Sequence, residues 1–138
     1  MSKIRFGVSV DKELLYTFDS VMKEKGYDNR SEYLRDLMRR EVVDHTWGSE
    51  EQEVVGVAVY VFEHDKREVN DKILEHAHAH HGLVISTLHI HMDKKNCLEI
   101  CVLQGKAGDV RRVGERMVAE KGVKFGRFIP ATTGKDIV

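Results

Sequence analysis

The chain has 138 residues, of which 41% are hydrophobic and 33% charged, and its formal net charge is −1. This composition is typical of one globular domain or two very small ones, and the balanced charge excludes a general electrostatic attraction to nucleic acid or to a membrane surface. Because no apolar run approaches the roughly 20 residues of a membrane span and the first residues lack a secretory signal, we expect a cytoplasmic protein with two free cysteines.

In residues 4–10, apolar residues alternate with small or polar ones, which predicts a short strand with Arg5, Gly7 and Ser9 on its polar face. A lone strand has unpaired edges, and residues 1–44 are too few to enclose a core. We therefore expect a dimer in which two such strands pair as an antiparallel ribbon over four helices. A ribbon of this kind fits the major groove of DNA. A dimerisation module without DNA binding is the alternative.

Two amphipathic helices are predicted after this strand. Asp11 is the expected N-cap of the first helix, and Gly26 is its expected C-terminal stop. Asn29 and Glu32 have the spacing of a capping box at the start of the second helix.

A polar, acidic stretch at residues 44–53 then breaks the helical pattern. It predicts a linker at residues 46–53, between an N-terminal domain of residues 1–45 and a C-terminal domain of residues 54–138. The elements expected in the C-terminal domain are a strand at 54–62, a helix at 66–81, strands at 83–92 and 97–104, a helix at 109–121 and a strand at 123–129. The order βαββαβ predicts a ferredoxin-like fold, so the whole chain is of the α+β class.

The hairpin at residues 88–100 contains the strongest candidate for a metal site. His89 and His91 alternate with apolar residues, so both imidazoles lie on one face of the strand, about 7 Å apart along it. A loop of residues 93–96 would turn Cys97 to the opposite face. A loop of residues 92–96 would place Cys97 beside His91 and Glu99 beside His89. Hairpins use both loop lengths, and the alternative is a plain hairpin with exposed histidines.

Imidazole and thiolate ligands suit zinc, copper or nickel, and planar coordination would point to nickel or copper. Glu99 could orient a ligand histidine by accepting its hydrogen bond. Cys101 lies about 13 Å further along the strand than Cys97 and is expected to be a core residue. The four histidines at positions 76, 78, 80 and 81 could supply a further ligand or simply lie exposed at the end of a helix.

Several segments share their residues with a known family. They are Ile4-Arg5-Phe6, Gly26-Tyr27 with Asn29-Arg30-Ser31-Glu32, Glu63-His64-Asp65-Lys66-Arg67-Glu68, and Leu88-His89-Ile90-His91 with Cys97-Leu98-Glu99. In these segments, and over nearly its full length, the chain closely resembles the NikR nickel-responsive transcriptional regulators.

The resemblance implies a ribbon-helix-helix DNA-binding domain joined to an ACT-type, ferredoxin-like regulatory domain, in a homotetramer that binds double-stranded operator DNA. It implies one square-planar Ni(II) site per subunit that crosses a subunit interface. His89, His91 and Cys97 would come from one subunit and His78 from another. Ala77 precedes His78 where the family usually has Gln, so His76 or His80 could take this role.

The resemblance also implies a potassium-like cation site at Glu32 and Asp36, and an approach of Lys66 and Arg67 to the DNA backbone. Because Gly7 has no side chain, base reading would fall to Arg5 and Ser9 or to DNA shape. The implied function is that of a nickel-dependent repressor of nickel uptake genes, which is not an enzyme. The alternatives are a metal-binding enzyme or carrier, and an ACT-type sensor of a small metabolite.

Overall fold

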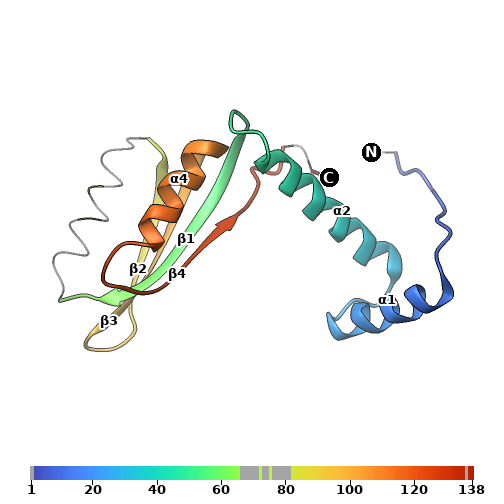
Figure 1. The fold of residues 1–138 in the computed structure, drawn as a ribbon, viewed down its shortest axis with the longest axis horizontal. Coiled ribbons are helices and arrows are strands. Elements are labelled where there is room, and N and C mark those ends of the chain that lie inside the picture. Colours follow the sequence, from blue (N-terminus) through green and yellow to red (C-terminus); the bar gives the residue numbers. More distant parts are fainter. Residues whose placement is uncertain (1, 66–71, 73–74, 76–81, 136) are drawn as a thin grey trace. The chain divides into compact units, whose positions relative to one another are not determined.

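The computed structural model describes residues 2–65, 72, 75, 82–135, 137 and 138 (Figure 1). It divides the chain into two compact units, with the boundary between Arg40 and Glu41. The helix predicted at 66–81 lies outside the described residues except for Lys72 and Glu75, which are helical. Among the described residues, no helix is long and apolar enough to cross a membrane.

The N-terminal unit contains α1 (Lys12–Glu24) and the start of α2 (Arg30–Trp47). Gly26 adopts a left-handed conformation with φ of 84°, and its N–H donates to the Lys23 carbonyl, which ends α1 as predicted. The start of α2 also follows the prediction, because the Asn29 side-chain oxygen accepts a 2.9 Å hydrogen bond from the backbone N–H of Glu32. Asp11 occupies the N-cap position of α1, as predicted, although among the described residues its side chain makes no capping hydrogen bond.

Contacts between α1 and α2 hold this unit together. The ring of Tyr33 is buried and lies 5.0 Å from that of Phe18 and 4.7 Å from that of Tyr27, measured between centroids. Arg30 donates two hydrogen bonds of 2.8 Å to the carboxylate of Asp19. These contacts fix the angle between the two helices.

Residues 2–10, all within the described part of the chain, form no strand. The strand predicted at residues 4–10 is therefore not formed by this single chain. Its apolar side chains are exposed: Ile4, Phe6, Val8 and Val10. The physical reason is that a strand needs a neighbour for its backbone hydrogen bonds, and none of the described segments provides one.

The second helix continues past residue 44, where the polar sequence predicted its end, and reaches Trp47. The indole of Trp47 is only 6% exposed, and its N–H donates a 2.8 Å hydrogen bond to the carbonyl of Ala131. Its ring also packs edge-on against the ring of Phe128, with 5.7 Å between the two centroids. Burial of this large side chain stabilises a last helical turn that the local sequence alone does not favour.

The C-terminal unit is a mixed α/β structure with a four-stranded antiparallel sheet, in the order β2-β3-β1-β4 among the described residues. The strands are β1 (Glu53–Glu63), β2 (Val84–His91), β3 (Asn96–Lys106) and β4 (Val123–Pro130). Helix α4 (Ala107–Val118) lies over one face of the sheet (Figure 1). The core lies between α4 and this face, and its largest fully buried side chains include Tyr60, Phe62, Leu103, Val110 and Met117. The opposite face also carries apolar side chains, and several of them are exposed: Leu88, Ile90, Phe125 and Ile129.

Candidate metal centre

The candidate centre lies at the end of the β2–β3 hairpin, where His91 pairs with Cys97 and His89 pairs with Glu99. This register requires the longer loop, residues 92–96, and excludes the pairing of Met92 with Cys97. Cys97 is also opposite the buried Phe62 of β1, so these side chains lie on the face of the sheet that packs against α4. The alternation of the two strands therefore places both imidazoles and the thiol together.

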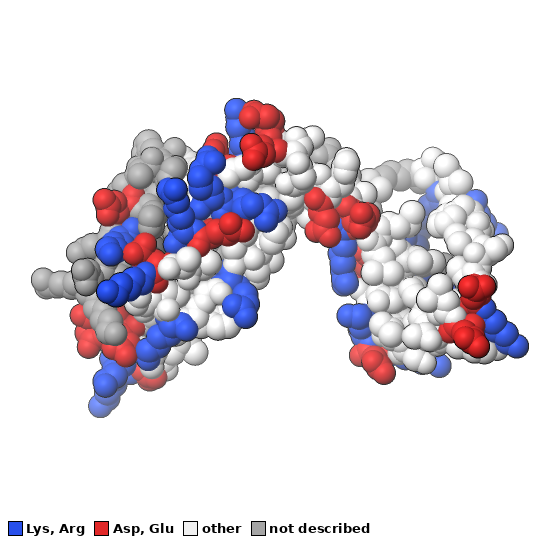
Figure 2. Space-filling view, viewed as in Figure 1, with Lys and Arg blue, Asp and Glu red and all other residues white. Residues whose placement is uncertain are grey.

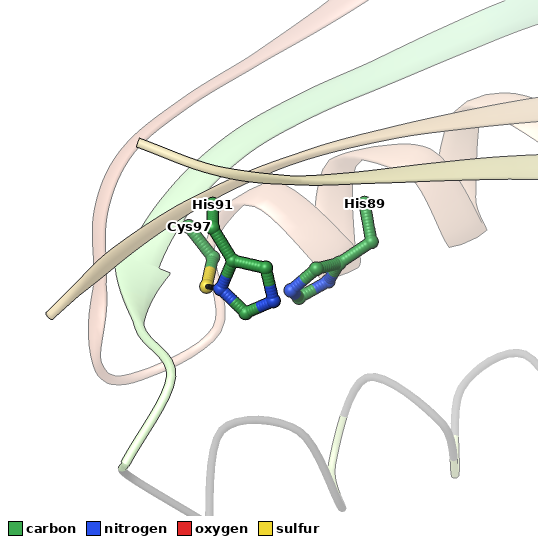
Figure 3. Close-up of side chains that lie close together, drawn as sticks. All are labelled: His89, His91 and Cys97. Carbon is green, nitrogen blue, oxygen red and sulfur yellow. Dashed lines mark hydrogen bonds between the residues drawn. The ribbon is translucent and has the colours of Figure 1, made fainter. Parts of the chain in front are cut away.

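The potential ligand atoms of His89, His91 and Cys97 all lie within 4.8 Å of one another. Figure 3 shows the three side chains projecting to the same side of the hairpin. The two imidazole centroids are 5.0 Å apart, and the Cys97 sulfur lies 3.5 Å from Nδ1 of His91. Both histidines are exposed, whereas Cys97 is buried. The cluster thus has two accessible imidazoles above a sheltered sulfur.

Burial raises the pKa of the Cys97 thiol, and the nearby negative charges of Glu99 and Asp93 raise it further. In the free protein this sulfur therefore favours the neutral thiol. A bound cation would supply the positive charge that stabilises the thiolate. The negative charges of Glu99 and Asp93 near this sulfur would also attract a cation.

Glu99 is placed to orient one of the histidines. Its Oε2 lies 3.4 Å from Nδ1 of His89. When Nδ1 carries the proton, it donates to this carboxylate and leaves Nε2 of His89 available for an ion.

Asp93 closes the loop between the two strands. Its Oδ1 accepts hydrogen bonds of 2.7 Å from the backbone N–H groups of Lys95 and Asn96, and its Oδ2 accepts one of 2.9 Å from the Asn96 side chain. These donors lower the pKa of Asp93 to about 2, so its carboxylate is charged at neutral pH. The loop that separates His91 from Cys97 therefore has its own internal hydrogen bonds.

A family model described as the NikR C-terminal nickel binding domain matches residues 55–130. Proteins of Pelobacter propionicus and Geobacter sulfurreducens are each 46% identical to the chain over 134 residues, which cover 97% of this chain and 96% of theirs. A protein of Thermococcus onnurineus is 46% identical over the full length of both chains. All three are named as candidate nickel-responsive regulators.

The chain belongs to the nickel-responsive regulator family. The family assignment agrees with the resemblance found in the sequence. The part of the chain that matches the nickel binding domain, residues 55–130, includes all three of the converging side chains.

The other residues singled out from the sequence fall into three groups. His78, Lys66 and Arg67 lie outside the described residues, as do His76, His80 and His81. Arg5, Gly7 and Ser9 lie on the exposed N-terminal segment. Cys101 is a buried core residue beside Thr87, as expected.

Glu32 and Asp36 lie one turn apart on α2, the spacing expected of two ligands on one helix face. Protein groups already contact Asp36. The Tyr27 hydroxyl donates a 2.6 Å hydrogen bond to its Oδ2, and Arg39 donates one of 2.6 Å to its Oδ1. These contacts lower the pKa of Asp36, with the Tyr27 hydroxyl as the largest cause.

The sequence interpretation gave no separate role to His64, which the structure places beside the centre. Its ring centroid is 5.5 Å from that of His91, and its Nε2 contacts the carbonyl oxygen of Lys94. The signal that the sequence offered was the position of His64 just after the strand predicted at 54–62. The structure brings it to the centre because Glu63, the last residue of β1, pairs with Asn96 next to Cys97.

Proposed function

We propose that the chain is a nickel-dependent DNA-binding regulator, in which Ni(II) held by His89, His91 and Cys97 favours binding to operator DNA. The observation that carries this proposal is the convergence of two imidazoles and a thiol within 4.8 Å. Imidazole and thiolate together are a suitable donor set for Ni(II). A bound ion would neutralise the thiolate and join the two strands of the hairpin.

Three ligands leave room for one more, and we propose that His78 of a second subunit supplies it, so that each subunit of a homotetramer binds one Ni(II). The exposed apolar face of the sheet supports assembly. Leu88 and Ile90 on β2 and Phe125 and Ile129 on β4 expose between 39% and 54% of their surface, and a second copy of the chain would bury them. The strand order β2-β3-β1-β4 also supports a ferredoxin-like, ACT-type arrangement of residues 54–138.

We further propose that residues 1–45 form half of a ribbon-helix-helix dimer, joined to the regulatory domain by residues 46–53. Pairing of two N-terminal segments would bury their exposed apolar side chains and turn Arg5, Gly7 and Ser9 toward the major groove. On the face drawn in Figure 2, basic and acidic side chains are interspersed. Because the formal net charge of the whole chain is −1, the attraction to DNA would come from a few local groups, including Lys66 and Arg67.

The cation site at Glu32 and Asp36 is part of the same proposal. Binding there would require Asp36 to exchange its contacts with Tyr27 and Arg39 for contacts with the ion. Metal binding can favour DNA binding only through a difference in affinity between two arrangements of the assembly, and a coupling of about 1–3 kcal/mol would be ordinary.

The metal part of the proposal is tested by titration with Ni(II), followed by absorption of the thiolate-to-nickel band. The Cys97→Ala variant should lose this band and most of its affinity. The Cys101→Ala variant is a matched control, because it removes a second buried thiol from the same strand and should retain the band. An unchanged band in Cys97→Ala would remove Cys97 from the site.

The DNA part is tested by selecting duplexes from a random pool in the presence of Ni(II) and measuring their affinity by fluorescence anisotropy. Binding should require Ni(II) and weaken as salt rises, because phosphate contacts release counterions. Removal of the Arg5 side chain should cost about 1–3 kcal/mol if Arg5 contacts a base edge. Binding that is indifferent to Ni(II) would contradict the proposed regulation.

A further inference from the structure

Residues outside the loop between His91 and Cys97 contact it, in addition to the hydrogen bonds that Asp93 makes within it. Lys124 on β4 places its Nζ 2.8 Å from Oδ1 of Asn96 and 3.3 Å from Oε1 of Glu63. The backbone N–H of His64 donates a 2.9 Å hydrogen bond to the carbonyl of Lys95. The loop is thus tied to residues at the end of β1 and the start of β4.

The contact from Lys124 reaches across the sheet. β4 pairs with β1 and is separated from the hairpin by that strand, because the order is β2-β3-β1-β4. Lys124 passes the end of β1 to reach Asn96, which directly precedes Cys97. A contact over this distance along the sheet is not needed to close the hairpin, which already has its own turn.

The position of the loop matters because it separates two of the three converging side chains. His91 is the last residue before it, and Cys97 follows it directly. A slip of one residue in the register would turn the thiol to the opposite face of the sheet. Contacts that fix the loop therefore also fix the thiol beside the imidazole.

We propose that Asp93 and Lys124 are positioning residues of the metal centre, which lock the loop and hold the Cys97 thiol against His91 before an ion binds. The inference rests on the proposed function, since it takes Cys97 and His91 as metal ligands. Lys124 is 47% exposed, and an ion pair of this kind contributes little to folding. Its removal should therefore affect the site more than the stability of the protein.

The test compares disruptive and conservative variants at both positions. Asp93→Ala removes the acceptor of two backbone N–H groups, whereas Asp93→Asn keeps one acceptor oxygen. Lys124→Met removes the donor, whereas Lys124→Arg keeps it. Lys106→Met is a matched control, because Lys106 forms a 2.9 Å ion pair with Glu51 and does not contact the loop.

Ni(II) affinity is measured on the full chain by competition with a chelator, together with amide hydrogen exchange at Lys95 and Asn96 in the metal-free protein. Asp93→Ala and Lys124→Met should weaken affinity by about 10–100-fold, the usual effect of removing a group that orients a metal ligand. Exchange at these two amides should accelerate in Asp93→Ala. The conservative variants should restore most of the affinity, and Lys106→Met should match the unaltered protein.

The outcomes separate this inference from the proposed function. If Cys97→Ala loses Ni(II) binding but Asp93→Ala and Lys124→Met bind as tightly as the unaltered protein, the centre stands and the positioning role is wrong. If Cys97→Ala itself binds normally, both fail. Loss of Ni(II) affinity together with a lowered melting temperature, without recovery in Asp93→Asn or Lys124→Arg, would show general destabilisation and also overturn the inference. If Asp93→Ala does not fold, the Lys124 pair decides alone.

Discussion

Residues 4–10 and residues 84–91 both have the alternating pattern of a strand, but only the second segment forms a strand within the single chain. The strand that contains His89 and His91 pairs with β3, whereas residues 4–10 form no strand and leave Ile4 88% exposed. The difference lies in where the partner strand is found. An alternating pattern predicts which side chains share a face, but it does not say whether the neighbour belongs to the same chain.

The largest expected effect concerns the region that the chain completes by itself. Trp47→Ala should lower the free energy of unfolding by about 3–5 kcal/mol, because it removes a buried indole that packs on Phe128. Urea denaturation followed by circular dichroism measures this change. Trp47→Phe keeps most of the apolar packing but loses the hydrogen bond to Ala131, so its cost should be smaller. Equal stability of Trp47→Ala and the unaltered protein would mean that the end of α2 is not held by this contact.

The N-terminal segment, by contrast, should depend on packing against a second chain. Phe6→Asp places a charge where a second chain is expected to pack, and the loss of burial should cost about 2–3 kcal/mol per subunit. DNA binding should therefore fall at least 30-fold, an expectation that follows from this energy. Ni(II) binding at the hairpin should not change. Phe6→Leu is the control and should bind DNA nearly normally. A Phe6→Asp variant with full DNA affinity would contradict pairing between two such segments.

The two predicted helix caps offer a smaller comparison. Asn29→Ala should lower the unfolding free energy by about 1 kcal/mol, because it removes the hydrogen bond to the Glu32 N–H. Asp11→Ala should cost clearly less, since the Asp11 side chain makes no capping bond among the described residues. Both are measured by chemical denaturation. A cost for Asp11→Ala as large as that for Asn29→Ala would indicate that its cap forms only when the preceding segment is paired.

The smallest expected effect is a dependence on pH in the N-terminal unit. The hydrogen bonds from Arg30 lower the pKa of Asp19 below its ordinary value. The ion pair therefore contributes fully above the ordinary carboxyl pKa, and its contribution is lost as the pH falls through the lowered pKa. In Arg30→Ala, NMR titration should show the pKa of Asp19 returning toward its ordinary value. An unchanged pKa would mean that the pair does not persist in solution.

Local patterns predicted the hairpin well because strand alternation and loop length depend on neighbouring residues. The pairing of His91 with Cys97 was one of two explicit alternatives, and the structure selects it. By contrast, the burial of Trp47 and the approach of His64 depend on Ala131 and Lys94, which are distant in sequence. The same is true of Lys124, which meets the loop only because the sheet order brings β4 beside β1. No local periodicity records such contacts.

The burial of Cys97 beneath two exposed imidazoles also has a consequence for the survival of the site. Oxidants and alkylating reagents attack the thiolate, and a sheltered sulfur with a raised pKa presents little of it. The metal-free protein should therefore keep this sulfur reduced and chemically inert until a cation draws off its proton. The arrangement that leaves both imidazoles exposed therefore shelters the thiol, the most readily oxidised of the three side chains.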